Sequence, residues 1–272
     1  MICSLIKIIF MVGVNCGILS LCGESLNTQK AVKGGIMISK NQLFDLVQDD
    51  KSIRQLSLET KEELAKRFGS AFAAMKDYDQ DNPHHHLDLL SHTIEVATSI
   101  VDKKIATTDF IELRIAALYH DIGKPFVAQH KDNRHVFYGH PEKSWEISKP
   151  LLTEIGLNHD SILRIGYYIA YHDAFISFKF KEELPAKPNP YLKEINKDNV
   201  LWLIISVQQK QIESNQFVPS FADFSNMMLL CVADAYGQAF RVFSHGKMID
   251  SRQNKVRRML RIRDIIDTEI RE

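Results

Sequence analysis

Apolar residues recur at intervals of three and four along most of the chain after Met37, which is the spacing that places them on one face of a helix. Ser39 with Gln42 and Thr60 with Glu63 form capping boxes, which predict that helices begin there. No alternating strand pattern or hairpin turn follows residue 37. The pattern therefore predicts an all-α domain, with further helices at 86–101, 107–121, 141–155, 161–172, 198–213, 220–240 and 251–270.

Single residues suggest where some of these helices begin and end. The helix that starts at Thr60 is expected to continue to Met75, because its apolar residues share one face. Pro141 suits the first turn of a helix that stops at Gly156. Asp160 is expected to cap the following helix.

Residues 1–36 differ from the rest of the chain. Their apolar stretch, 8–21, is interrupted by glycines and is too short and broken for a membrane span. It lacks the Gly-Lys-Ser/Thr of a phosphate-binding P-loop. A secretory signal, a degenerate strand and a start-site artefact are alternative interpretations. We therefore divide the chain into a leader of unknown role, 1–36, and a helical domain, 37–272, with a core at about 84–240.

Composition adds one informative feature, the histidines. The 272 residues carry 34 basic and 34 acidic side chains, so no global field favours a nucleic acid or a membrane. The four cysteines show no C-x-x-C spacing, which indicates neither a disulfide framework nor a zinc knuckle. Eleven histidines are present, and imidazole is the commonest transition-metal ligand.

Six ligand-type side chains occupy apolar helical sequence. Asp121 ends the helix at 107–121 directly after His120, and Asp234 lies within an apolar run. A buried carboxylate is costly unless it is paired or bound to a cation. The other members of the set, each on or at the end of a helix, are His92, His140 and His172. A helical bundle can bring such residues to one interior point, although each histidine taken singly could be an ordinary core or capping residue.

This donor set suits metal chemistry. Mixed nitrogen and oxygen ligands fit Mn, Fe, Ni, Co or Zn, and less well Mg. Four imidazoles and two carboxylates are enough for two divalent ions, with Asp121 placed to bridge them. Such a pair can clamp a phosphoryl group for in-line displacement.

Over about residues 84–240 the chain resembles the HD superfamily of metal-dependent phosphohydrolases, in the order and flanking residues of His92, His120-Asp121, Lys124, His140, His172 and Asp234. The resemblance implies an HD-domain helical bundle, here with a C-terminal helical extension. It implies a first metal on His92, His120, Asp121 and Asp234, and a second on His140 and His172. The sequence around these residues is most similar to the HD domain of bacterial CCA-adding enzymes. The nucleotidyltransferase head of those enzymes is absent here.

Three cationic or imidazole side chains near the ligands are expected to contact the substrate. Lys124 follows the His-Asp doublet, at a position that the family uses near the substrate phosphate, so we expect it to act in catalysis and substrate binding. Arg134 and His135 lie on a flanking loop and are expected to bind the phosphate. Solvated loop residues are the alternative for all three.

Together these observations predict a metal-dependent phosphohydrolase or phosphodiesterase. It would hydrolyse a phosphoester of a nucleotide or an RNA end, with a metal-bound hydroxide attacking phosphorus. The expected partner is a phosphorylated small molecule or RNA end, with no membrane, in the cytoplasm unless the leader directs secretion. The alternatives are a non-catalytic HD module that senses a nucleotide or binds RNA, and a mononuclear enzyme in which His140 and His172 contact substrate.

Overall fold

A computed structural model describes residues 37–81, 86–101, 105–132, 134–174, 194–214, 216–238, 242–244, 247–249 and 252–271. They belong to one compact unit, Gly34–Glu272. The leader, 1–36, and residues 175–193 lie outside the described residues.

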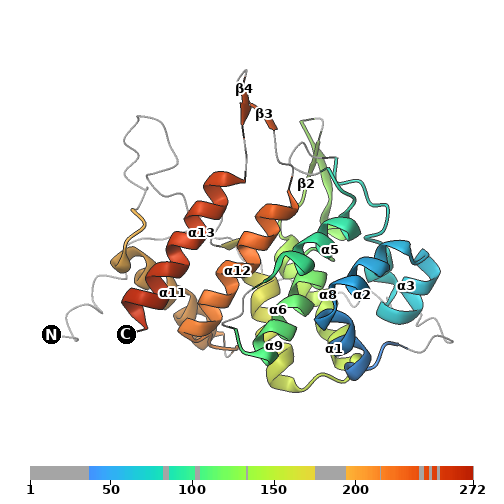
Figure 1. Cartoon of the computed structure of the whole chain (residues 1–272), viewed down its shortest axis with the longest axis horizontal. Helices are drawn as coiled ribbons and strands as arrows, with labels where there is room; N and C mark the ends of the chain where they lie inside the picture. The colour runs from blue at the N-terminus through green and yellow to red at the C-terminus, as the bar shows by residue number, and fades with distance from the viewer. Residues whose placement is uncertain are drawn as a thin grey trace. The chain divides into compact units, whose positions relative to one another are not determined.

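Helices make up most of the described chain, which confirms the all-α prediction (Figure 1). The first group comprises α1 (Lys40–Gln48), α2 (Asp50–Gln55), the 3-10 turn η2 (Leu56–Leu58), α3 (Lys61–Phe68) and α4 (Ser70–Ala73). The middle group comprises α5 (Leu89–Ser99), α6 (Thr107–Tyr119), α7 (Lys124–Val127), α8 (His140–Ile155) and α9 (His159–Tyr171). The last group comprises α11 (Lys197–Glu213), α12 (Phe221–Gly237), α13 (Gln253–Ile265) and the π-helical turn η4 (Ile266–Ile270).

Several helix boundaries differ from the sequence-based expectation. Both capping boxes form, at Ser39 and at Thr60. The helix from Thr60 nevertheless stops at Gly69, whose φ of 91° cannot continue a helix. Asn158 caps α9, whereas Asp160 lies in its first turn, where a carboxylate favours the positive end of the helix dipole.

The core is centred on α6 and α12. Nearly all of α6 is buried, from Ile111 to Tyr119, and it packs between α5 and α9. Helix α12 lies between α5 and α13, as Figure 1 shows, and its Met227 and Met228 side chains are fully buried. Four helices, α5, α6, α9 and α12, therefore surround the interior that the predicted ligands would have to share.

The expectation that strands are absent after residue 37 is wrong. Two short antiparallel hairpins occur, β1 (Gln129–Lys131) with β2 (Arg134–Val136), and β3 (Val242–Ser244) with β4 (Lys247–Ile249). In the first hairpin His130 pairs directly with His135. Strands of three residues are too short to show an alternating pattern, which is why the sequence does not reveal them.

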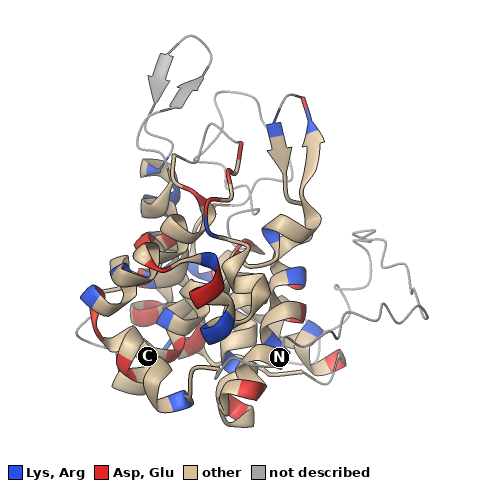
Figure 2. Cartoon of the chain, turned by 90° about the vertical axis from the view of Figure 1, so that its right-hand side faces the viewer, with Lys and Arg blue, Asp and Glu red and all other residues tan. Residues whose placement is uncertain are grey.

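Charged residues are spread over the described helices, with basic and acidic positions interspersed in Figure 2. This distribution agrees with the formal net charge of zero. None of the helices that the structure describes has the length and apolar composition needed to cross a membrane.

Candidate metal centre

Five helices, α5, α6, α8, α9 and α12, and the turn after α6 bring the six predicted ligands to one interior point. His92 lies on α5, Asp234 on α12, and His140 is the first residue of α8. His120 and His172 are the C-cap residues of α6 and α9, and Asp121 follows His120 in the next turn. All six side chains are buried, from 0% exposed for His92 to 8% for His140.

The backbone fixes the orientation of all four imidazoles. Nδ1 of His120 lies 2.7 Å from the carbonyl of Ala117, and Nδ1 of His172 lies 2.7 Å from that of Ile169. The other two rings make the same kind of bond, His140 to Phe137 O at 2.9 Å and His92 to Gly237 O at 3.1 Å. A carbonyl oxygen only accepts, so each Nδ1 donates and each Nε2 faces the interior. This is how proteins orient metal-binding histidines.

The Nε2 atoms surround Asp121 in two sets, one nearer each carboxylate oxygen, and the sets adjoin because donors of His120, Asp121 and His172 also lie within 4.8 Å of one another. Asp121 Oδ2 lies 3.2 Å from Nε2 of His120 and 3.5 Å from Nε2 of His92. Asp234 Oδ1 completes this first set, 3.0 Å from Nε2 of His92.

The second set faces the other carboxylate oxygen. Asp121 Oδ1 lies 3.2 Å from Nε2 of His140 and 3.7 Å from Nε2 of His172. These two Nε2 atoms are 3.2 Å apart. The carboxylate of Asp121 thus stands between two groups of inward-facing donors, as a bridging ligand would.

Three inward-facing atoms at the centre lack well-aligned hydrogen bonds, although Asp121 Oδ2 forms an ion pair with Lys124 Nζ at 2.7 Å. His120 Nε2 and both carboxylate oxygens of Asp121 are buried, and none of them makes a well-aligned hydrogen bond to a described residue. Buried polar atoms without partners are rare because they lose their hydration without compensation. A cluster of such atoms aimed at one another fits a cation, which would satisfy all of them at once.

The electrostatics of the protein without bound metal agree with this arrangement. Burial lowers the pKa of His120, but the charges of Asp121 and Asp234 outweigh burial and raise it to about 10. Burial would raise the pKa of Asp121, but His120 and Lys124 hold it well below its usual range. Burial lowers the pKa of the His172 ring, which favours its neutral, ligand-competent form.

One acidic side chain at the centre, Asp173, was not predicted from the sequence. Asp173 Oδ2 lies 3.4 Å from Nε2 of His140, and its Oδ1 lies 3.9 Å from Nε2 of His172. Its side chain is 44% exposed, so it reaches the second set from the solvent side. A signal was available, because Asp173 follows His172 just as Asp121 follows His120.

Lys124 lies against the centre rather than out in a loop. It is 6% exposed, and its Nζ is 2.7 Å from Asp121 Oδ2. Nζ also donates to Gln80 Oε1 at 3.0 Å and lies 5.5 Å from the ring centroid of Phe137. Gln80, 1% exposed, is a second residue that the sequence did not single out.

Arg134 and His135 are not among the residues that contact the six ligands through polar or ring interactions. Both are on β2, where Arg134 is exposed, and among the described residues no hydrogen bond, ion pair or ring contact joins either of them to the six ligands. His135 instead lies beside His130 and against the ring of Tyr78. Their expected role in phosphate binding stays a prediction.

Two glycines permit close approach at the centre. A Cβ on Gly123 would lie 2.5 Å from the backbone nitrogen of Ser144, so the turn after Asp121 can pack directly on α8. The Ser144 hydroxyl accepts from the Gly123 N–H at 2.9 Å. A Cβ on Gly237 would lie 2.8 Å from Nδ1 of His92. Both glycines therefore set the spacing between the elements that carry ligands.

This geometry, with buried histidines around a His-Asp doublet in a helical bundle, can be compared with known families. The HD domain matches residues 89–203. HD domains are generally metal-dependent hydrolases, and the match supports a relation to the HD superfamily. The matched HD segment contains every candidate ligand except Asp234, which α12 brings in from beyond it. No curated protein matches the chain.

Proposed function

We propose that this protein is a metal-dependent phosphohydrolase or phosphodiesterase that hydrolyses a phosphoester of a nucleotide or an RNA end. The observation that carries the proposal is the position of Asp121. Its two carboxylate oxygens face different histidine sets, and neither has a well-aligned hydrogen bond among the described residues.

The residues at the centre fit two divalent ions. His92, His120, Asp121 and Asp234 would hold one, and Asp121, His140 and His172 the other, with Asp173 beside the second. When bound, a metal pair supplies Lewis acidity toward a phosphoryl oxygen and activates water. The protein itself would orient the ligands, supply charge near the phosphate and exclude bulk water.

Lys124 is placed to position the phosphate. Its ammonium has three N–H groups, two of which are directed to Asp121 and Gln80. The third can be donated to a phosphate oxygen, where the positive charge would counter charge that develops during displacement. Because Lys124 is almost fully buried, that interaction would be little weakened by water.

The test is turnover of bis-p-nitrophenyl phosphate by purified protein with added Mn²⁺ or Ni²⁺, together with metal analysis. We expect bound metal and metal-dependent hydrolysis, and loss of turnover to background in Asp121→Asn. The matched control is Asp160→Asn, which removes an exposed carboxylate on α9. Absence of bound metal, with no metal restoring turnover, would overturn the proposal.

A substrate screen then narrows the class. It would include 2′,3′-cyclic nucleotides, cyclic dinucleotides, dinucleoside polyphosphates and triphosphates. RNA ends would be included as well, because the sequence around the ligands resembles that of the HD domain of CCA-adding enzymes. A nucleotide that binds and survives unchanged with metal present would instead favour a sensing module.

A further inference from the structure

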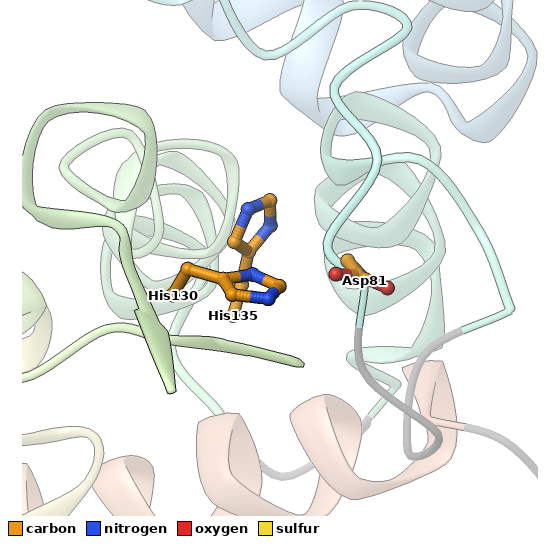
Figure 3. Close-up of side chains that lie close together, drawn as sticks. All are labelled: Asp81, His130 and His135. Carbon is orange, nitrogen blue, oxygen red and sulfur yellow. The ribbon is translucent and has the colours of Figure 1, made fainter. Parts of the chain in front are cut away.

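A second group of metal-type side chains lies outside the candidate centre, at the β1–β2 hairpin. Asp81, His130 and His135 each offer a donor atom, and these three atoms lie within 4.8 Å of one another. Figure 3 shows the two imidazole rings next to each other on the hairpin, with Asp81 on the neighbouring chain segment before α5. None of the three belongs to the Asp121 centre.

The backbone builds this cluster from two distant segments. His130 and His135 are directly paired across the hairpin, so their side chains lie on the same face, with ring centroids 5.9 Å apart. The backbone N–H of His135 donates to the carbonyl of Asp81 at 3.1 Å. Asp81 itself has a φ of 41°, and its N–H is held by the Asp79 carboxylate at 2.9 Å. The three side chains are therefore held together by main-chain contacts and not by chance rotamers alone.

His135 carries an unsatisfied nitrogen at this cluster. Its Nδ1 is buried and has no hydrogen-bond partner among the described residues. The Tyr78 ring lies nearly parallel to the imidazole at a centroid distance of 6.4 Å and the Phe137 ring lies edge-on at 6.1 Å, so two aromatic neighbours restrict its orientation. A ring that is oriented but unpartnered is what a ligand-binding histidine requires.

We propose that Asp81, His130 and His135 form a binding site for a divalent transition metal ion of the zinc type, separate from the Asp121 centre. Two imidazole nitrogens and one carboxylate oxygen are a common set for zinc sites that keep a fourth position open. Ligand bonds of about 2.1 Å place donor atoms roughly 3.4 Å apart. Asp81 and His130 are exposed, so small side-chain rotations close the remaining distance. The bound ion would cross-link the hairpin to the segment that contains Asp81.

The test is Zn²⁺ stoichiometry after equilibrium dialysis, measured by elemental analysis. We expect His130→Ala to bind one equivalent fewer than the wild type. Asp81→Asn keeps the shape of the side chain, and asparagine tolerates the positive φ, so it should weaken the same equivalent without a backbone change. The matched control, His159→Ala, removes an exposed histidine on α9 and should retain wild-type stoichiometry.

The outcomes separate this site from the proposed catalytic centre. Asp121→Asn should lose metal at the centre and still bind the equivalent that depends on His130. The proposal is overturned if His130→Ala binds as much Zn²⁺ as the wild type, or if His159→Ala loses as much as His130→Ala. Thermal unfolding in chelator checks that His130→Ala is folded, as expected for an exposed side chain.

Discussion

Replacing Gly237 by alanine should weaken metal binding at the centre without removing a ligand. Gly237 is the last residue of α12, and a Cβ there would lie 2.8 Å from Nδ1 and 2.9 Å from Cε1 of His92. Ordinary van der Waals contact begins at 3.4 Å. The His92 ring must therefore retreat by about half an ångström, away from the carbonyl that orients it.

The expected magnitude follows from what that movement disturbs. The bond from His92 Nδ1 to Gly237 O, 3.1 Å long, contributes about 1 kcal/mol. Groups that orient metal ligands typically affect metal affinity by about 10- to 100-fold when they are altered. Helix propensity acts in the opposite direction, because alanine is about 1 kcal/mol better than glycine inside a helix. We therefore expect near wild-type stability in chelator, with metal affinity reduced about tenfold or more.

The assay is competition for Zn²⁺ or Mn²⁺ with a chromophoric chelator, run beside thermal unfolding in excess chelator. Gly166→Ala is the matched control, because its Cβ would lie 2.6 Å from the Trp145 ring, a site of packing between α8 and α9. That variant should lose stability while its metal affinity stays within about twofold of the wild type. Wild-type affinity in Gly237→Ala, or an equal loss of affinity in Gly166→Ala, would refute the reasoning.

Three further predictions follow from the centre and its supports. His172→Ala should reduce the metal content of the centre by one ion and leave the other bound, as elemental analysis would show; loss of both or neither contradicts two separate sets. Metal binding should release a proton near neutral pH, because neighbouring carboxylates overcome burial and hold the pKa of His120 at about 10 in the metal-free protein. Since only the neutral ring binds metal, metal affinity should rise by about tenfold per pH unit below that pKa. Calorimetry in buffers of different ionisation enthalpy measures the proton release, and binding without proton release would contradict the prediction. Glu112→Ala should destabilise the protein by about 2 kcal/mol, because Glu112 is buried and accepts from Arg164 at 2.9 Å, and an unchanged urea midpoint would contradict this.

The helical fold could be predicted from the sequence because its signals are local. Capping boxes at Ser39 and Thr60 and the apolar periodicity depend on residues three or four apart, and the structure confirms these helices. The errors arise where contacts between residues far apart in the sequence determine a helix boundary. Gly69 breaks the expected long helix at a point where a Cβ would press on Leu151, some eighty residues away in the chain.

The candidate centre could be predicted in residue type but not in detail. His120-Asp121 and Asp234 are conspicuous because carboxylates and imidazoles in apolar helices need partners. Gln80 lies in polar sequence, where such a residue needs no explanation, whereas Asp173 repeats the His120-Asp121 doublet and could have been recognised from that repeat. Only the fold shows that Gln80 is buried against Lys124 and that Asp173 reaches His140.

The repeated His-Asp doublet shows how the two halves of the centre are built. His120 and His172 are both C-cap residues, and each ring donates through Nδ1 to the carbonyl three residues earlier. The last carbonyls of a helix have no partner within the helix, so each ring satisfies one of them and is oriented in the same step. Helix C-termini also carry partial negative charge, which favours a cation beside them. Two helix ends, α6 and α9, thus direct the same His-Asp arrangement toward one interior point. The halves differ in burial, because the Asp121 carboxylate is 1% exposed and that of Asp173 is 44% exposed. A metal held beside Asp173 would therefore be the more accessible of the two to solvent and chelators, and we expect it to exchange first.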